Sequence, residues 1–352
     1  MSRRRAVVGM SGGVDSAVTA YLLKAAGYDV IGLTLKTWLG AESRCCEIGA
    51  AQAVCGQLGI PYYVQNCLTD FRTQITEPFV REYLRGRTPN PCVLCNRAVK
   101  WTKLLEAADA MHAELIATGH YASAVRLPGG RFAVQQGRYS EKDQSYMLYR
   151  LTQAQLARTV MPLGQFSKAE VRTIARAAGI AVAEKADSQE ICFVPDGNYA
   201  DFVEENAQQP LPPDGLFTDA SGAALGRHHG VYRYTVGQRR GLGIAAGKPV
   251  YVTEIDAESN RIILGDAAAL LKNEIVCGDL CFQAAAEMPP GAHFAANVKI
   301  RYHHPAQSAV CEMQRDGSLR IRFAVPVRAA APGQSAVAYD SAGRVLCGGI
   351  IQ

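Results

Sequence analysis

The most constraining feature of the sequence is a glycine-rich turn between an apolar run and a helical pattern. Residues 5–10, RAVVGM, have the length and apolar character of a short buried strand. After the turn GMSGGVDS, residues 9–16, apolar side chains recur at helical spacing from Val14 to Ala25, and Gly27 ends the pattern. A strand that passes through glycines directly into a helix is the first unit of an α/β fold.

The same alternation continues to about residue 121. Further strands are predicted at residues 30–35, 61–66 and 114–121, and helices at residues 48–58, 70–85 and 96–111. Alternating strands and helices predict a parallel sheet with helices on both faces. Ligands in such folds bind beyond the C-terminal ends of the strands.

The second half of the chain has a different character. A last amphipathic helix is predicted at residues 167–179, where Ser167 and Glu170 have the spacing of a capping box. NAQQPLPPDG, residues 206–215, is typical of a linker, and residues 293–304, 318–327 and 334–340 alternate like strands of an antiparallel barrel. We therefore predict a catalytic α/β domain at residues 1–200, a small central domain at 201–270 and a C-terminal antiparallel β-barrel at 271–352.

The glycine turn has the chemistry of an anion site. Gly12 and Gly13 allow backbone amides to approach a ligand closely, the following helix directs its N-terminus to the same place, and Ser11 and Ser16 add hydroxyl donors. There is no Gly-Lys-Ser/Thr, so this is not the lysine-containing phosphate loop. Asp15 suits phosphates only if Mg²⁺ lies between them or its carboxylate caps local amides. The plain alternative is a turn that merely closes a strand–helix unit.

Two cysteines stand three residues apart in GRTPNPCVLCN, residues 86–96. We expect Cys92 and Cys95 in a loop before a helix capped by Asn96, where the helix N-terminus and nearby cations favour thiolate. The alternative is half of a structural zinc site, for which only Cys277 and Cys281 offer a second pair. Cys192 follows Asp187, Ser188 and Glu190, and by itself is typical of a buried core residue.

Composition limits the cellular compartment and the kinds of partner that we expect. The chain has eleven cysteines and no recognisable secretory signal, so we expect free thiols and a cytoplasmic protein. No run of about 18 apolar residues predicts a membrane span. The net charge of +5 allows a phosphate-rich partner but is below that of most dedicated nucleic-acid binders.

Taken in order, eight segments resemble the signatures of one family. They are SGGVDS (11–16), GRTPNPCVLCN (86–96), ATGHY (117–121), KDQSYML (142–148), DSQEICF (187–193), TVGQRRGLGI (235–244), IRYHH (300–304) and PGQSAV (332–337). The first resembles the pyrophosphatase loop of enzymes that cleave ATP to AMP and pyrophosphate. The whole set resembles the bacterial tRNA-specific 2-thiouridylases, which put sulfur on the wobble uridine of tRNA.

The resemblance implies roles for particular residues. Cys95 corresponds to the catalytic nucleophile and Cys192 to the carrier of the persulfide sulfur. ATP, with Mg²⁺, is implied at Gly9, Met10, Ser11, Gly12, Gly13, Val14, Asp15, Ser16, Leu35 and Gly119. Contacts with the anticodon stem-loop of tRNA are implied at Asn90, Pro91, Cys92, His120, Lys142, Asp143, Gln144, Arg301, Tyr302 and Gln334. The sulfur would come from a donor protein or persulfide carrier.

One position departs from the family pattern, because many members carry aspartate where this chain has Cys92. A thiol cannot replace the hydrogen bonding of a carboxylate. Cys92, Cys95 and Cys192 together suggest a variant hypothesis, a [4Fe-4S] cluster with one open iron. The competing functions are an amidotransferase-type synthetase with the same loop, and a tRNA-binding or sulfur-relay protein without catalysis.

Overall fold

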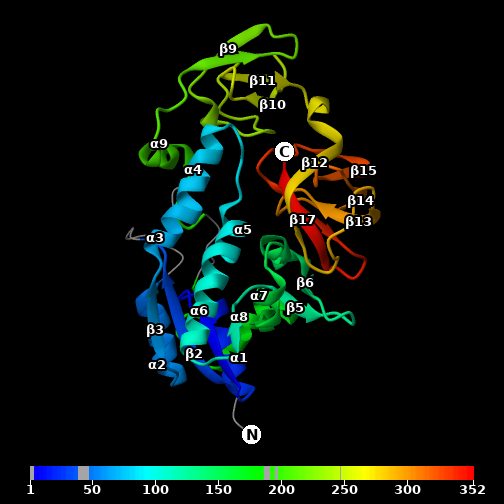
Figure 1. Ribbon diagram of the computed structural model, residues 1–352. Coiled ribbons are helices and arrows are strands. Elements are labelled where there is room, and N and C mark those ends of the chain that lie inside the picture. The colour runs from blue at the N-terminus through cyan, green and yellow to red at the C-terminus, as the bar shows by residue number, and fades with distance from the viewer. Residues whose placement is uncertain (1–3, 39–46, 186–190, 195–196, 246) are drawn as a thin grey trace.

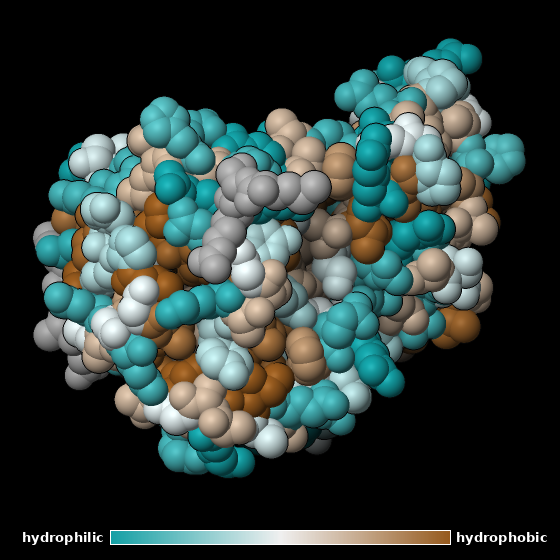
Figure 2. Space-filling model, turned by 90° about the horizontal axis from the view of Figure 1, so that it is seen from below, coloured by the Kyte–Doolittle hydropathy of each residue, from teal (hydrophilic) through white to brown (hydrophobic). Residues whose placement is uncertain are grey.

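The computed structural model describes residues 4–38, 47–185, 191–194, 197–245 and 247–352. Figure 1 shows an α/β body at the N-terminal end, a small β-sheet body at the opposite end, and a β-barrel beside the helices that run between them. In the face shown in Figure 2, hydrophilic side chains alternate with small patches of hydrophobic ones. Within the described residues, no helix is both long and apolar enough to cross a membrane.

The α/β body is built on five parallel strands in the order β3-β2-β1-β4-β7. These are β1 (Arg5–Gly9), β2 (Asp29–Lys36), β3 (Tyr62–Asn66), β4 (Leu115–Ala117) and β7 (Thr159–Val160). Val7 of β1 pairs with Ile31 on one side and with Ile116 on the other. The chain thus continues from the centre of the sheet to both edges, which creates a switch point beyond β1 and β4.

Helices cover both faces of this sheet, as predicted. On one face, Ala6 and Val8 pack against α1 (Val14–Ala25), α2 (Ile48–Leu58) and α8 (Lys168–Ala177). On the other face, Val7 packs with Trp101 and with Leu104 of α6 (Thr102–Ala110). The capping box of α8 is confirmed, because Ser167 and Glu170 each bond the other's backbone amide.

Two long helical segments run from this body toward the small sheet (Figure 1). The first joins α3 (Leu68–Phe71), a π-helical turn η1 (Arg72–Thr76) and α4 (Glu77–Leu84). The second joins α5 (Pro91–Cys95), a second π-helical turn η2 (Asn96–Trp101) and α6. Each π turn inserts a register change in a continuous helix, a feature often found at functional sites.

The second helical segment begins six residues earlier than predicted. Asn90, not Asn96, is the cap, and its Oδ1 accepts a hydrogen bond from the amide of Val93 at 3.4 Å. Pro91 follows at the first helical position, where the missing N–H has no effect on helix bonding. Cys92 and Cys95 therefore lie in the first turns of a helix and not in a loop. Asn96 is buried within it and donates to the Met147 carbonyl at 3.0 Å.

Residues 122–165 form small elements that the sequence did not predict. They are the hairpin β5 (Ala122–Arg126) and β6 (Phe132–Gln136), the 3₁₀ turns η3 (Ser140–Lys142), η4 (Ser145–Leu148) and η5 (Pro162–Gln165), and α7 (Gln153–Ala157). The predicted strand at 114–121 is correspondingly too long, because β4 ends at Ala117. Gly119, His120 and Tyr121 therefore lie in the loop beyond the sheet.

The small body follows α9 (Tyr199–Asn206). Its four strands have the order β10-β11-β8-β9, with β8 (Gly215–Thr218), β9 (Ala224–His228), β10 (Tyr251–Asp256) and β11 (Arg261–Gly265). Two 3₁₀ turns complete it, η6 (Val231–Arg233) and η7 (Ala268–Leu270). No helix or strand is formed at residues 207–214, within the segment predicted as a linker.

The C-terminal antiparallel barrel is confirmed as a closed six-stranded barrel in the order β12-β15-β14-β13-β16-β17. Its strands are β12 (Leu271–Phe282), β13 (His293–Lys299), β14 (Gln307–Met313), β15 (Leu319–Arg328), β16 (Ser335–Tyr339) and β17 (Val345–Ile351). The strand predicted at 293–304 is too long. It ends at Lys299, because the amide of His304 bonds the Arg301 carbonyl in a turn that Pro305 follows.

Candidate active site

The glycine-rich loop lies at the switch point of the parallel sheet, between β1 and α1. Gly12 has φ +81°, and a Cβ there would lie 2.7 Å from the carbonyl oxygen of Glu47. Only glycine fits this backbone and this space. Within the described residues, the amides of Gly12, Val14 and Asp15 have no hydrogen-bond acceptor. Together with the N-terminus of α1, they form the donor set of an anion site.

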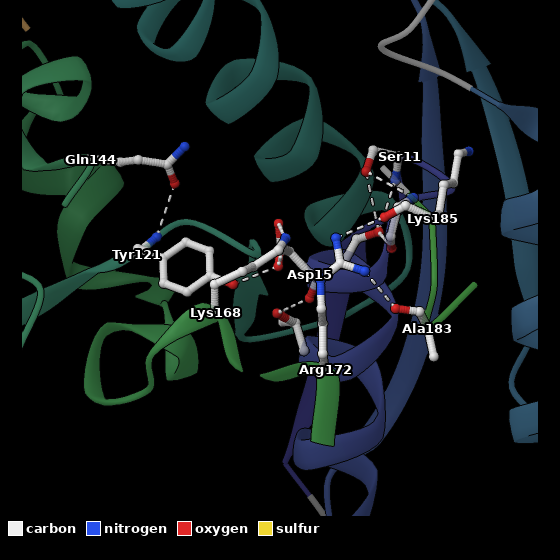
Figure 3. A network of polar contacts seen from close by, with 11 residues as sticks. Ser11, Asp15, Tyr121, Gln144, Lys168, Arg172, Ala183 and Lys185 are labelled. Atoms are coloured by element: carbon white, nitrogen blue, oxygen red, sulfur yellow. Dashed lines mark hydrogen bonds and ion pairs between the residues drawn. The ribbon is translucent and has the colours of Figure 1, made fainter. Parts of the chain in front are cut away.

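The two serines of the loop hold its shape. The Ser16 hydroxyl donates to the Gly13 carbonyl at 3.0 Å and accepts from the Ser11 amide at 3.2 Å. The Ser11 and Ser16 hydroxyls are 3.2 Å apart, and Ser11 Oγ also accepts from the Gly13 amide at 3.4 Å. These short-range bonds (Figure 3) close the loop on itself and keep its remaining amides available to a ligand.

Asp15 is held by two partners from other parts of the chain. Lys168 Nζ lies 2.8 and 2.9 Å from the two carboxylate oxygens, and the Tyr121 hydroxyl donates to Oδ1 at 2.6 Å (Figure 3). The carboxylate is bonded to these two side chains and caps no backbone amide of the described residues, and the Mg²⁺ explanation stays a prediction. The Lys168 ammonium offsets its charge next to the anion site. The capping box at Ser167 places Lys168 at the first position of α8.

A second lysine reaches the loop from the segment before Cys192. Lys185 Nζ donates to the Gly12 carbonyl at 3.2 Å and forms an ion pair with Glu47. Arg172 of α8 donates to the carbonyls of Ala183 and Lys185 at 2.8 and 2.9 Å, which ties this segment to the helix (Figure 3). Lys168, Arg172, Lys185 and Tyr121 were all missed by the sequence analysis. The only signals were a lysine directly after a helix cap and a lysine directly before the DSQEICF segment.

We expect Lys168→Gln to raise the KM for ATP about tenfold, because the Asp15 carboxylate would then repel phosphates without an adjacent cation. Steady-state release of pyrophosphate measures it. Lys272→Gln, an exposed lysine on β12, is the matched charge control and should behave as wild type. The double variant Asp15→Asn/Lys168→Gln should recover part of the loss. A KM that stays unchanged in Lys168→Gln would contradict this role.

Gly119 fits directly against the start of α1. A Cβ at this position would lie 2.8 Å from the carbonyl carbon of Asp15 and 2.9 Å from the amide nitrogen of Ser16. Leu35, at the end of β2, packs half-buried on the other side of the site. Leu35 and Gly119, both predicted to contact ATP, thus lie at or just beyond strand ends that flank the loop. Their contact with ATP remains a prediction.

Cys95 and Cys192 are brought together by one hydrophobic cluster, the aromatic cluster, which forms around Phe71, Phe79, Phe193 and Phe202. Phe193 packs edge-on against Phe79 with ring centroids 5.1 Å apart. Cys95 is buried in this cluster, 6% exposed, and Cys192 and Leu35 are half-buried against it. Residues 97 positions apart therefore share a site near the end of β2. Asp187, Ser188 and Glu190 lie outside the described residues.

Cys92 has a different environment from Cys95. It is half-buried near Tyr302, and together with Asp143 it raises the pKa of Tyr302, although burial is the larger cause. Tyr302 follows β13 in a turn, with its ring centroid 6.2 Å from that of Tyr146. Lys299 Nζ lies 5.8 Å from the Tyr302 ring, within cation–π range. Tyr302 and the helix start that carries Cys92 thus face each other across the junction of barrel and α/β body.

The barrel also holds the backbone in front of the cysteines. The Thr88 amide donates to the Pro332 carbonyl at 2.8 Å, and Gln334 Nε2 donates to the Thr88 carbonyl at 3.0 Å. Thr88 Oγ1 is 3.4 Å from Thr235 Oγ1 in the segment after η6. All three bodies of the molecule therefore meet at Thr88. Gln334, predicted to contact tRNA, uses its amide to position this loop.

Asp143 and Gln144, both predicted to contact tRNA, are hydrogen-bonded to neighbouring segments of the α/β body. Asp143 is buried and accepts from the amides of Gly137 and Ser145 and from the Ser145 hydroxyl. Gln144 Oε1 accepts from the Tyr121 amide at 3.0 Å. This supports the same loop that carries the Asp15 partner Tyr121. Contacts of Lys142, Asp143, Gln144 and Arg301 with RNA remain predictions.

The comparisons with known proteins agree with this geometry. A family model described as "tRNA methyl transferase HUP domain" matches residues 4–196, more than half of the chain. A "tRNA methyl transferase PRC-barrel domain" model matches residues 200–266, and an "Aminomethyltransferase beta-barrel domain" model matches residues 272–351. The tRNA-specific 2-thiouridylase MnmA of Lachnoclostridium phytofermentans is 46% identical, over 98% of both chains. This chain belongs to the tRNA-specific 2-thiouridylase family.

Other members of the 2-thiouridylase family are similar over their whole length. The tRNA-specific 2-thiouridylase MnmA of Acetivibrio thermocellus is 45% identical over 100% of both chains. That of Clostridium perfringens is 42% identical over 100% of this chain and 99% of its own. The likeness thus includes the loop, both cysteine segments and the barrel together.

A metal site is one hypothesis for the cysteines that the structure describes. Among the described residues, which include Cys92, Cys95 and Cys192, no three His, Cys, Asp or Glu side chains are placed to hold a metal ion. Cys95 lies in the aromatic cluster, whereas Cys92 is near Tyr302. Cys277 and Cys281, which the sequence offered as a second pair for zinc, belong to the barrel strand β12. The [4Fe-4S] cluster on Cys92, Cys95 and Cys192 stays a prediction.

The pH response of the fold should depend on His120, whose pKa is lowered to about 3 by burial and by the nearby Lys100 cation. Its Nδ1 is 2.9 Å from Thr118 Oγ1, and its ring packs 5.3 Å from Trp101. An unfolded histidine has a pKa of about 6.5, so between pH 6.5 and 3 the unfolded chain binds more protons. Stability should therefore fall as pH falls through this window.

Urea denaturation of wild type and His120→Gln at pH 7.5 and 5 measures the effect. The free energy of unfolding of the variant should fall less on acidification than that of wild type. The two pH slopes should differ by at most the contribution of one bound proton. Equal pH slopes in the two proteins would show that another group is responsible.

Proposed function

We propose that this chain is an ATP-dependent tRNA-uridine 2-sulfurtransferase that acts on the wobble uridine. The observation that carries the proposal is the joint placement of Cys95, Cys192 and Leu35 in one cluster beyond the sheet that carries the anion-binding loop. Replacement of the uracil C2 oxygen requires a good leaving group and a sulfur nucleophile. The loop supports the first requirement and the cysteine pair supports the second.

The first step is adenylation. The C2 oxygen of uracil attacks the α-phosphate of ATP, and pyrophosphate leaves toward the loop. The unbonded amides of Gly12, Val14 and Asp15 are suited to stabilise the charge on the leaving oxygens. Mg²⁺ would enter on the phosphates of ATP, because the Asp15 carboxylate is already paired with Lys168 and Tyr121.

The second step is sulfur transfer. The terminal sulfur of a persulfide on Cys192 attacks C2, a C–S bond forms, and AMP leaves with the former C2 oxygen. The Cys95 thiolate then attacks Sγ of Cys192, which breaks the persulfide S–S bond and forms a Cys95–Cys192 disulfide. The electron pair of the broken bond stays on the sulfur of the new 2-thiouridine. A donor protein or persulfide carrier must afterwards reduce the disulfide and reload Cys192.

The substrate is best presented by the anticodon stem-loop, because a reactive base must leave its stack to enter a protein site. Asn90, Pro91 and Cys92 at the start of α5 are proposed to meet the base. His120, Lys142, Gln144, Arg301, Tyr302 and Gln334 are proposed to lie near the RNA. An amidotransferase-type synthetase has no need for the cysteine pair, and an inactive relay protein has no need for the loop.

The test is reconstitution. Purified protein is mixed with ATP, Mg²⁺, a persulfide donor and unmodified tRNA, and the digested nucleosides are examined by mass spectrometry. We expect 2-thiouridine with release of one AMP and one pyrophosphate for each base modified. Release of AMP without sulfur in the RNA, or a methylated nucleoside in its place, would overturn the proposal.

A further inference from the structure

A cavity of about 460 Å³ lies where α4 and the start of α5 meet the end of the barrel. It lies apart from the glycine-rich loop and borders the aromatic cluster, because Ile75 and Phe79 of that cluster also line it. Three arginines from different segments line it, Arg81, Arg87 and Arg150, together with Asn90, Asp279 and Gly333. The volume is in the range of sites for nucleotide-sized groups and is much larger than one inorganic anion needs.

Arg150 is buried, with its side chain only 10% exposed, and uses little of its hydrogen-bonding capacity. Its Nη2 donates to Asp279 Oδ2 at 2.6 Å. Within the described residues, Nε and Nη1 have no acceptor. A guanidinium has five N–H donors. A buried guanidinium with a single hydrogen-bond partner therefore destabilises the fold. An unsatisfied buried cation in a cavity indicates that a negatively charged ligand completes it.

The barrel strand is shaped to hold this arginine. Asp279 has φ +49° and lies in a register irregularity of β12 between Gly278 and Cys281. Such an irregularity turns a side chain out of the strand pattern, here toward Arg150. The contact joins the barrel to the α/β body and leaves Nη1 without a partner among the described residues.

The other two arginines differ in how many hydrogen bonds and ion pairs their side chains already make. Arg87 donates from Nε to Glu82 at 2.8 Å and from Nη2 to the Ile351 carbonyl at 3.2 Å. Arg81 is exposed on α4 and makes no side-chain ion pair with the described part of the chain. Among the lining side chains alone, the three arginines exceed the carboxylates of Glu82 and Asp279 by one positive charge. Arg150 and Arg81 are the two donors that remain for a ligand.

We propose that this cavity binds a backbone phosphate of the tRNA, with Arg150 as the main donor and Arg81 as the second. The inference rests on the proposed function. RNA is favoured over a free anion because Asn90, Pro91 and Leu94 also line the cavity. These residues belong to the helix start that carries Cys92 and Cys95, so a phosphate bound here fixes the strand beside the reacting base. Phosphate contacts of this kind set the register of a nucleic acid on a protein.

The first arm of the test measures tRNA affinity without ATP or a sulfur donor, at several KCl concentrations. Arg150→Gln should weaken binding about tenfold at low salt. It should also reduce the slope of log affinity against log salt by about 0.7 to 0.9, the value for one lost phosphate contact. Arg85→Gln is the matched control, because Arg85 is on the same side of the molecule at the end of α4 but does not line the cavity. It should remain close to wild type.

The second arm distinguishes two roles of Arg150, which are binding of a ligand and a purely structural contact between the barrel and the α/β body. Asp279→Asn breaks the same ion pair but keeps the guanidinium, so tRNA binding should be as tight as wild type or tighter. Thermal unfolding of both variants reports any shared structural loss. Equal weakening in Arg150→Gln and Asp279→Asn would show that Arg150 is only a strut and would overturn the inference.

The third arm separates RNA from a free anion. Titration calorimetry is run with inorganic phosphate and with pyrophosphate, without tRNA. We expect to find no phosphate or pyrophosphate binding that is present in wild type and lost in Arg150→Gln. Such binding, combined with unchanged tRNA affinity in the variant, would assign the cavity to a free anion and overturn the inference. If wild type itself does not bind tRNA, the proposed function fails; if wild type and Arg150→Gln bind equally, only this inference fails.

Discussion

Serine in place of Cys95 or of Cys192 is expected to lower 2-thiouridine formation by about 1,000-fold or more, because each thiol makes or breaks a bond in the proposed sequence. The two variants should fail at different points. Cys192→Ser has no sulfur to load and should not retain label from a ³⁵S-persulfide donor. Cys95→Ser can still form the Cys192–S–S–C2 adduct but cannot resolve it. A protein–tRNA complex that thiols dissociate should therefore accumulate in Cys95→Ser alone.

The control for this experiment is Cys281→Ser. Cys281 is also half-buried and free, but it lies on β12 in the barrel, outside the aromatic cluster. It should keep near wild-type activity. Both active-site variants should still release pyrophosphate, since neither thiol takes part in adenylation. Wild-type levels of 2-thiouridine in either variant would end the proposed mechanism, whereas loss of pyrophosphate release would point to a folding defect.

Gly119→Ala is expected to lower ATP cleavage by about 100-fold, the second large effect. A Cβ at this position would lie under 3.0 Å from backbone atoms of Asp15 and Ser16, which cannot move as a flexible side chain can. Relief of the clash must shift the start of α1 and therefore the amides of the loop. A misplacement of catalytic groups by about 1 Å can reduce a rate about 100-fold. Strain of this kind also costs about 1–3 kcal/mol of folding stability.

The matched control for Gly119→Ala is Gly129→Ala. Gly129 lies in the turn between β5 and β6, and a Cβ there would meet no atom within 4 Å. It should leave both ATP cleavage and the unfolding temperature close to wild type. Pyrophosphate release and thermal unfolding of the two variants give the comparison. An unchanged rate in Gly119→Ala would show that β4 and its loop do not constrain the anion site.

Structural features that depend on a few neighbouring residues were predicted well from the sequence. The glycine loop between β1 and α1, the capping box of α8 and the alternation of the barrel strands are properties of a few adjacent side chains. The start of α5 was misjudged for a similar local reason. Asn90 and Asn96 both suit a cap, and Pro91 at the first helical position decides between them.

Interactions between distant segments were not predicted. The Lys168–Asp15 pair joins residues 153 positions apart, and the Thr88 junction involves residues from all three bodies. Neither leaves a periodic pattern or a spacing in the sequence. Likewise, the pKa of His120 is lowered by its burial and, to a smaller extent, by Lys100, and neither effect can be inferred from the sequence.

By itself the sequence indicated the alternating strands and helices of the α/β body, the strands of the barrel and the anion-binding chemistry of Gly9–Ser16, because these depend on local conformation and on side-chain type. The roles of Cys95 and Cys192 came from the family resemblance and stay predictions. Only the tertiary structure decided that Cys95 and Cys192 share the aromatic cluster, that Lys168 neutralises Asp15, and that Arg150 is buried with donors to spare. Contacts of this range arise when the sheet, the two long helices and the barrel pack together, and packing is a property of the whole chain.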